Sequence, residues 1–350
     1  MVCAHPLVGA RRIDSPEWKE PAQVLYRRLG KTGRDVSAIG FGAWAIGADW
    51  GKVDDAESLR ALHAAADAGV TLIDTADVYG DGHSEQVISR FLGERSGERF
   101  FVATKMGRRA PLDMAEYTPE AFRAWVDRSR DNLRMDRLDL VQLHCLPTSI
   151  YYHPESFAAL DELVAAGAIA NYGVSVERVE EGLKALEYPG VASVQIIFNM
   201  LRQRPADRFL AEAKRRDVGV LARVPMASGL LTGKMTKQTA FAATDHRSYN
   251  RHGEAFDVGE TFAGVDFDAG LAFVEELRAL VPAGATMAQM ALRWILEFDG
   301  VTAAIPGAKS PEQARGNAAA ADLAAIPPAT MDRIRAMYEE RIKPLVHQRW

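Results

Sequence analysis

The sequence predicts an α/β fold of the (β/α)8 TIM-barrel class, with an N-terminal hairpin and a long loop after the seventh strand. Eight apolar, strand-like runs recur along the 350 residues, and each is followed by a stretch with helical patterning. This alternation favours parallel strands with right-handed crossovers, and eight repeats favour a closed barrel over an open sheet. In addition, several runs end in polar residues, as strands do at the catalytic end of such barrels.

The strands can be placed in order along the chain. Residues 1–24 are interpreted as a polar extension and residues 25–350 as one barrel domain. The turn glycines Gly30 and Gly33 predict a hairpin over 26–37. The eight barrel strands are then expected at 38–44, 70–74, 100–105, 138–144, 169–175, 191–197, 219–224 and 301–306.

Helices are expected between these strands because capping residues precede apolar-periodic stretches, as at Thr118-Pro119. The segment at about 226–269 is the exception, since it has little periodicity and follows the seventh strand. A loop of that length in a compact domain is usually functional, so we interpret it as a lid over cofactor or substrate. The expected helices are 56–68, 84–92, 118–133, 154–166, 177–187, 205–216, 271–281, 286–297 and 310–320.

Composition excludes several classes of protein. The formal charge of −5 and the lack of a long basic run argue against a nucleic-acid binder. The two cysteines are too few for a disulfide framework and lack zinc-site spacing, which favours a reducing, cytoplasmic setting. No apolar run approaches the roughly 20 residues of a membrane span, so no membrane partner is expected.

Four polar residues stand at or just after the ends of three successive strands: Asp74, Tyr79, Lys105 and His144. A nearby ammonium stabilises a phenolate and lowers the pKa of the phenol, and a carboxylate can hold that ammonium in place. The set therefore suits carbonyl reduction, with Tyr79 as general acid, Lys105 as its modulator, Asp74 as the partner of Lys105, and His144 orienting the carbonyl. Each residue alone could be structural, but together they form a specific pattern.

The chain resembles the aldo-keto reductase family over about residues 25–325, in the branch of microbial reductases related to potassium-channel β subunits. The matching motifs are Gly40-Phe41-Gly42, Gly69 to Gly80, Ala103-Thr104-Lys105, Asp139 to His144, Gly173-Val174-Ser175, Gly229 to Lys234, and Ile305 to Ser310. The resemblance implies hydride transfer from NADPH to an aldehyde or ketone, with NAD(H) as the alternative cofactor and Tyr79 as proton donor. A small carbonyl or alcohol is then the expected partner.

The resemblance also implies cofactor contacts. Ser175 and Gln195 match the positions that hold the carboxamide, with Asn199 close by, and the last strand and helix match the adenosine-phosphate clamp. Two positions depart from the family: Val176 stands where an asparagine is frequent, and Arg223 stands where a tyrosine often stacks on the nicotinamide. A guanidinium can also lie flat on a ring. The expected clamp residues are Gly307, Lys309, Ser310, Gln313 and Asn317.

The substrate is left open, because aldehydes, ketones, sugars and steroid-like molecules all suit such a site. Trp44, Trp50 and Tyr151 are expected to line the pocket, and Cys145 is expected to be a small wall residue with no nucleophilic role. Two other functions are weighed. A cofactor-sensing regulatory subunit would keep the barrel, whereas a metal-dependent hydrolase would need a further histidine or carboxylate at a strand end, so no metal is expected.

Overall fold

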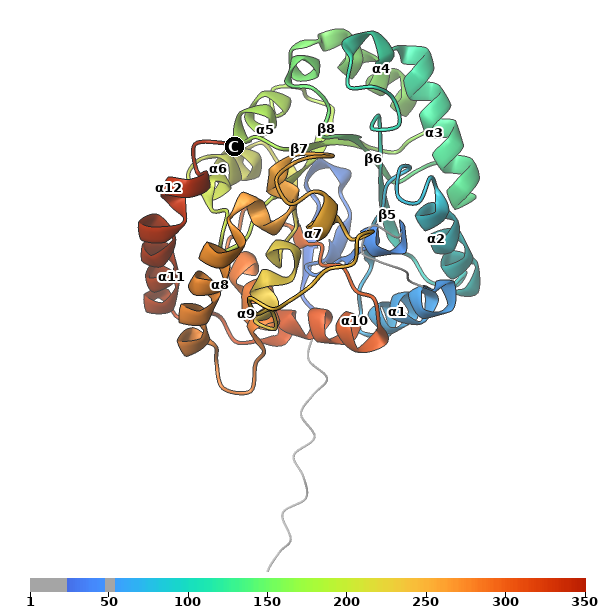
Figure 1. Ribbon diagram of the computed structural model, residues 1–350. Helices are drawn as coiled ribbons and strands as arrows, with labels where there is room; N and C mark the ends of the chain where they lie inside the picture. The colour runs from blue at the N-terminus through green and yellow to red at the C-terminus, as the bar shows by residue number, and fades with distance from the viewer. Residues whose placement is uncertain (1–23, 48–53) are drawn as a thin grey trace, which may run out of the picture.

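Eight parallel strands form a closed barrel in the computed structural model, which describes residues 24–47 and 54–350 (Figure 1). The strands pair in chain order, and the register is parallel throughout. Closure comes from hydrogen bonds that Gly40 and Ala304 donate to Ala304 and Ala38, at 2.8 and 2.9 Å. The predicted barrel is confirmed. Its strands are β3 (Phe41–Gly42), β4 (Leu72–Asp74), β5 (Phe101–Met106), β6 (Leu140–His144), β7 (Tyr172–Val176), β8 (Val191–Ile197), β9 (Gly219–Arg223) and β10 (Ala303–Ala304).

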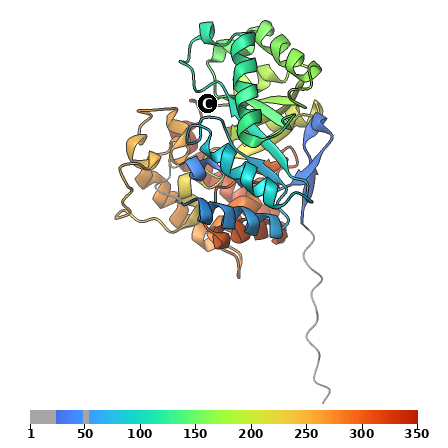
Figure 2. The same ribbon diagram turned by 90° about the vertical axis from the view of Figure 1, so that its right-hand side faces the viewer.

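The predicted hairpin is present as β1 (Tyr26–Arg28) and β2 (Asp35–Ser37), which pair antiparallel. Its apolar side chains Leu29 and Val36 join a buried cluster with residues that point into the barrel, among them Leu72 and Leu221. The hairpin therefore closes the end of the barrel at which the strands begin. Figure 2 shows it on the opposite side of the molecule from segment 226–269.

Helices cover the outside of the barrel, and most lie where the sequence predicts them. Helix α8 (Phe267–Leu277) begins four residues before the expected start at residue 271. It does so because the Asp266 side chain accepts hydrogen bonds from the Asp268 and Ala269 amides. The two helices after residue 320 are not in the sequence prediction. The helices are α1 (Asp55–Asp67), α2 (His83–Glu94), α3 (Pro119–Leu133), α4 (Pro154–Ala165), α5 (Val179–Ala185), α6 (Phe209–Arg215), α7 (His246–Tyr249), α8 (Phe267–Leu277), α9 (Met287–Leu296), α10 (Pro311–Ala318), α11 (Pro328–Arg341) and α12 (Lys343–Val346).

Segment 226–269 is irregular, as expected, but it is well packed. It contains α7 and three short 3₁₀ turns: η6 (Ala227–Thr232), η7 (Val258–Glu260) and η8 (Phe262–Gly264). The guanidinium of Arg251 lies 5.6, 5.1 and 4.9 Å from the ring centroids of Phe241, Phe262 and Phe267, respectively. The segment lies in front of the barrel's centre in Figure 1, over the ends of the strands that carry the candidate site.

Two sequence predictions fall on residues outside the described part of the chain. They are nearly all of the 1–24 extension, and Trp50 as a pocket residue. Among the described helices, none is long and apolar enough to cross a membrane.

Candidate active site

The register of the barrel brings the predicted residues to one edge. His144 pairs with Ser175, and Ser175 pairs with Gln195, so these three lie side by side at the carboxyl ends of β6, β7 and β8. Asp74 ends β4, and Lys105 is the penultimate residue of β5. Because the strands are parallel, all five side chains meet at the end of the barrel where TIM-barrel enzymes carry their chemistry.

Asp74 and Lys105 form a buried ion pair. Lys105 Nζ donates to Asp74 Oδ1 at 2.6 Å and to the Thr75 carbonyl at 2.7 Å, and its side chain is 1% exposed. Burial disfavours the ammonium, but the Asp74 carboxylate and Tyr79 outweigh it and hold the pKa of Lys105 above its ordinary value. The lysine is therefore a fixed positive charge, as the sequence analysis expects.

Tyr79 lies in the turn after β4, and its hydroxyl accepts a hydrogen bond from Lys105 Nζ at 3.4 Å. The turn is tight: Gly80 has a φ of 60°, and a Cβ at Gly47 would stand 2.8 Å from the Gly80 nitrogen. Burial raises the pKa of Tyr79 to about 12, although Lys105 lowers it. The lysine acts in the predicted direction, but burial is the larger effect. The phenol therefore keeps its proton at neutral pH, as a proton donor must.

His144 is buried edge-on to Tyr79, with ring centroids 5.9 Å apart. Burial, followed by the charges of Arg108, Lys105 and Arg223, lowers the pKa of His144 well below its ordinary value. The imidazole is thus neutral and carries one N–H. Its Nδ1 has no hydrogen-bond partner among residues 24–47 and 54–350, so this ring can orient a carbonyl without adding a charge.

Arg223 ends β9 at the place where the family resemblance leads one to expect a tyrosine. Its Nη2 lies 2.8 Å from Glu177 Oε1 and donates to the Val176 carbonyl at 3.2 Å, and its Nη1 lies 3.7 Å from Glu260 Oε1. The sequence analysis does not identify either glutamate. Glu177 follows β7 directly, so the polar end of that strand was a usable signal, whereas Glu260 lies in a segment without periodicity.

Arg108, on the loop after β5, is a further residue missed from sequence. Its Nη1 donates to Glu260 Oε1 at 3.0 Å, which ties segment 226–269 to the barrel beside His144. Burial would raise the pKa of Glu260, but Arg108 and Arg223 outweigh it and lower this pKa to about 2. Burial raises the pKa of Glu177 to about 7. The corner around Arg223 is therefore densely charged and dry.

Three residues in this corner resemble a metal site, because ligand atoms of Cys145, Glu177 and Glu260 lie within 4.8 Å of one another. However, the Arg223 guanidinium already lies among them, and its Nη2 donates to Cys145 Sγ at 3.4 Å. An arginine thus supplies the positive charge there. Burial also raises the pKa of the Cys145 thiol, which fits the expectation that it is not a nucleophile.

The predicted pocket residues differ in position. Trp44 stacks on Tyr79 with ring centroids 6.2 Å apart, and it lies 4.7 Å from His246 of segment 226–269. It therefore stands beside the candidate proton donor. Tyr151, in contrast, is fully buried, and its hydroxyl donates to the Ser175 carbonyl at 3.4 Å. Through this hydrogen bond Tyr151 supports the end of β7.

Comparison with known proteins assigns the family. Residues 38–339 match the Aldo/keto reductase family. The chain belongs to this family. It is 31% identical to the aldo-keto reductase YhdN of Bacillus subtilis over 298 residues, which cover 82% of this chain and 86% of that protein. It is 27% identical to a probable voltage-gated potassium channel subunit beta of Arabidopsis thaliana, over 91% and 98% of the two chains. The predicted relation to that branch is confirmed.

A solved structure supports the same assignment. The glycerol dehydrogenase AKR11B4 from Gluconobacter oxydans superposes with a TM-score of 0.74 at 30% identity, covering 91% of this chain and 96% of that one. This aldo/keto reductase is thus an oxidoreductase by family.

The other end of the site in this aldo/keto reductase is built around Lys309. Ser310 caps α10, and Gln313 and Asn317 of that helix hold the preceding loop: Lys309 N donates to Gln313 Oε1 at 2.7 Å, and Asn317 Nδ2 donates to the Gly307 carbonyl at 3.2 Å. Burial and the charge of Arg247 lower the pKa of Lys309. Lys309 therefore lies just before the N-terminus of α10 with Arg247 near it, and Arg247 itself pairs with Asp245 at 2.6 Å. A helix N-terminus with a lysine beside it suits phosphate. Arg247 was not predicted from sequence.

Asp77, two residues before Tyr79, gives a stability prediction for this reductase. Its side chain is fully buried, and within the described part of the chain neither carboxylate oxygen has a hydrogen-bond partner. Burial, with a contribution from Glu85, raises its pKa from 3.8 to about 7. The folded state therefore retains a proton that the unfolded chain loses, so stability falls as pH rises from about 4 through 7.

Asp77→Asn removes this charge without changing the shape of the side chain. We expect it to stabilise the protein at pH 8 by on the order of 1–3 kcal/mol, with the gain shrinking toward pH 5. Melting temperatures at the two pH values measure this difference. Asp81→Asn is the control, because that exposed carboxylate pairs with Arg109 and Arg128 and should not stabilise when neutralised. An equal effect of Asp77→Asn at both pH values would contradict the assignment.

Proposed function

We propose that this aldo/keto reductase reduces aldehydes or ketones to alcohols with NADPH, and that Tyr79 is the proton donor. The observation that carries the proposal is the contact of the protonated Tyr79 hydroxyl with the Lys105 ammonium at 3.4 Å, beside the neutral His144. A reduced nicotinamide supplies the hydride when it is bound. The residues named below would hold it and complete the reaction.

Each member of the tetrad then has one task. The His144 N–H orients the carbonyl oxygen toward the Tyr79 hydroxyl, which gives its proton to that oxygen as negative charge develops. The Lys105 ammonium stabilises the phenolate that remains, and Asp74 fixes Lys105 in place through the 2.6 Å bond. Gln195 donates to the second oxygen of Asp74 at 2.7 Å, so it helps to hold this pair. Trp44 would form one wall of the substrate pocket.

The residues present fit a dinucleotide phosphate. Lys309 and Arg247 would bind phosphate together with the N-terminus of α10, and the half-burial of Lys309 would strengthen that interaction. In this proposal Ser310, Gln313 and Asn317 shape the phosphate loop, while Ser175 and Arg223 stand at the nicotinamide end.

A binding titration followed by a turnover assay tests the proposal. Quenching of protein fluorescence by NADPH should saturate, and NADPH oxidation should be observed with members of a panel of aldehydes and ketones. Saturable binding without turnover of any carbonyl would favour the regulatory subunit, the other function considered from the sequence. The assembled tetrad favours the enzyme, since a sensor has no need of a proton donor.

The preference for NADPH over NADH gives a further prediction. The 2′-phosphate of NADPH carries charge that NADH lacks, and a charge-assisted hydrogen bond from Lys309 is worth about 1.5–3 kcal/mol. Lys309→Met should therefore weaken NADPH binding by about tenfold to 150-fold and leave NADH binding nearly unchanged. Titration of both cofactors measures this. The effect should also decrease as ionic strength rises.

Lys237→Met is the matched control, because that exposed lysine lies on the same segment as Arg247 and pairs loosely with Asp268 at 3.9 Å. It should change neither dissociation constant. Equal weakening of NADPH and NADH binding by Lys309→Met would contradict a 2′-phosphate contact. So would a wild-type protein that binds NADH as tightly as NADPH.

A further inference from the structure

The two departures from the family pattern are in contact in the structure. Val176, which replaces a frequent asparagine, ends β7, and Arg223, which replaces a frequent tyrosine, ends β9. The Arg223 Nη2 donates to the Val176 carbonyl at 3.2 Å. The side chain that lies beside them, Glu177, is the next residue in the chain. The nicotinamide end of the site is therefore built here from an arginine and a carboxylate.

Several polar atoms in this corner are buried without a hydrogen bond. Arg223 is only 7% exposed, and across the described residues its Nε–H has no acceptor. Both carboxylate oxygens of Glu177 are buried and also lack hydrogen bonds of good geometry. Glu177 Oε1 does lie 2.8 Å from Arg223 Nη2, so the two charges balance each other. The Glu177 oxygens nevertheless accept no well-directed hydrogen bond within the described residues. A buried donor and a buried acceptor left unsatisfied side by side suggest that a ligand completes them.

The amide side chains nearby are engaged elsewhere. Gln195 Nε2 donates to Asp74 Oδ2 at 2.7 Å. Asn199 Nδ2 donates to the Val224 carbonyl at 2.9 Å, and Asn199 Oδ1 accepts from the Leu201 amide at 2.9 Å. Neither can turn to a new partner without giving up one of these bonds. The Ser175 hydroxyl makes only a 3.5 Å contact with Cys145 Sγ within residues 24–47 and 54–350, so it can add one further hydrogen bond. The buried polar atoms that lack any hydrogen bond here belong to Arg223 and Glu177.

A guanidinium only donates hydrogen bonds and a carboxylate only accepts them, whereas a primary amide does both. We propose that Arg223 and Glu177 together bind the carboxamide of the nicotinamide ring. Arg223 Nε–H donates to the carboxamide oxygen, and Glu177 accepts from the carboxamide NH2. The pair takes over the hydrogen-bonding role of the asparagine that the sequence lacks. This inference rests on the proposed function, since it assumes that the site binds a nicotinamide cofactor.

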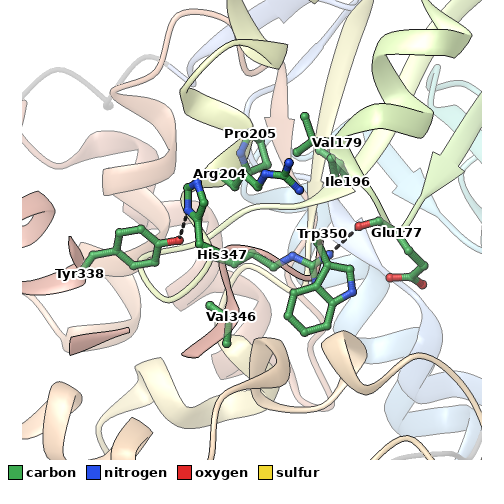
Figure 3. Close-up of a pocket in the computed structure, with 10 residues that line it drawn as sticks. Glu177, Val179, Ile196, Arg204, Pro205, Tyr338, Val346, His347 and Trp350 are labelled. Atoms are coloured by element: carbon green, nitrogen blue, oxygen red, sulfur yellow. Dashed lines mark hydrogen bonds between the residues drawn. The ribbon is translucent and has the colours of Figure 1, made fainter. Parts of the chain in front are cut away.

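The fold fixes both side chains for this role. The Glu177 amide donates to Glu181 Oε2 at 3.1 Å, and the Glu177 carbonyl accepts from Arg202 Nη2 at 2.5 Å. Arg202 in turn stacks on Trp350, with its guanidinium carbon 3.9 Å from the ring centroid. Figure 3 shows the Glu177 carbonyl bonded at the edge of a small cavity lined by Trp350, while the carboxylate extends away from that cavity. Glu177 is thus held through its backbone, and its carboxylate is left for a ligand.

The test compares NADPH with reduced 3-acetylpyridine adenine dinucleotide phosphate, in which a methyl group replaces the carboxamide NH2. Dissociation constants of both are measured by fluorescence quenching, and their ratio is taken within each variant. Differences in folding or phosphate binding between variants cancel in that ratio. Wild type should bind the acetylpyridine cofactor about tenfold more weakly or worse, the factor expected for a lost hydrogen bond to a charged group.

Glu177→Ala should bring this ratio close to one, because the acceptor for the NH2 group is gone. Arg223→Lys keeps a positive charge beside both glutamates but loses the Nε–H. This variant should weaken the binding of both cofactors by a similar factor, since both carry the carbonyl oxygen. The ratio of the two dissociation constants should therefore stay as in wild type. Glu180→Ala is the control: this exposed neighbour pairs with Arg204 on the surface, and its ratio should match wild type.

The outcomes separate the two proposals. A wild-type ratio near one, or a ratio unchanged by Glu177→Ala, overturns the carboxamide assignment while NADPH binding, and with it the proposed function, stands. A protein that does not bind NADPH at all overturns both.

Discussion

Tyr79→Phe is expected to lower the rate of carbonyl reduction by about 10²–10⁴-fold, the range for loss of a general acid. The hydroxyl is the only group removed, and the phenyl ring keeps its place against Trp44 at 6.2 Å. NADPH binding should therefore be nearly unchanged, because the phosphate loop at Lys309 is untouched. Single-turnover oxidation of bound NADPH, followed by absorbance, measures the step directly.

The matched control for this variant is Tyr172→Phe. Tyr172 is buried, and its hydroxyl donates to Asp161 at 2.8 Å, but it begins β7 at the other end of the barrel. It should lose stability and keep turnover. If Tyr79→Phe turned over a good substrate at a rate close to that of wild type, Tyr79 would not be the proton donor, whatever its contact with Lys105.

The pH dependence should reflect the same environment. Burial raises the pKa of Tyr79 to about 12 and lowers that of His144. At pH values between the pKa of His144 and the pKa of Tyr79, the phenol is protonated and the imidazole is neutral. Neither group should therefore titrate near neutral pH, and kcat/KM for reduction should not change with pH there on their account. The sequence analysis expected Lys105 to set the pKa of Tyr79. The phenol's degree of burial, which depends on Trp44 and segment 226–269, could not be read from the sequence.

What the sequence revealed depended on local signals. The barrel strands and most helices were predictable because each carries its own apolar pattern and capping residues. The candidate tetrad could be picked out because each member lies at or just after the end of a strand-like run. Helix α11 was missed because only Ile334, Met337 and Tyr338 of its 14 residues are buried, which leaves a weak apolar face. The strands β3 and β10 are shorter than predicted, at two residues each.

The charged corner was not predictable for a different reason. Arg108 and Glu260 are 152 positions apart, and neither carries a local signal that points to the other. Arg247 likewise comes near Lys309 from an irregular segment. Such pairs are defined by tertiary packing alone, so from one sequence only the strand-end residue Glu177 could have been singled out.

Asp74 and Lys105 are expected to act as one unit, which gives the last prediction. The ammonium and the carboxylate are both buried, 2.6 Å apart. Among residues 24–47 and 54–350, the other hydrogen bonds of the Lys105 ammonium go to the Thr75 carbonyl and the Tyr79 hydroxyl. Removing either side chain leaves the other as an uncompensated buried charge. Asp74→Asn and Lys105→Met should therefore each lower kcat/KM by about 10²-fold or more, since each disrupts the charge that stabilises the Tyr79 phenolate.

The double variant Asp74→Asn/Lys105→Met should be little worse than the poorer single variant, with a coupling of about 1–3 kcal/mol from the double-mutant cycle. The reason is that the second substitution removes a charge whose partner is already gone. The exposed pair Lys214 and Asp299 is the control, because surface ion pairs contribute little and its cycle should show almost no coupling. Losses in log kcat/KM that simply add in the Asp74 and Lys105 cycle would show that the two side chains work independently. In that case Lys105 would modulate Tyr79 without support from Asp74, and the 2.6 Å contact would serve folding alone.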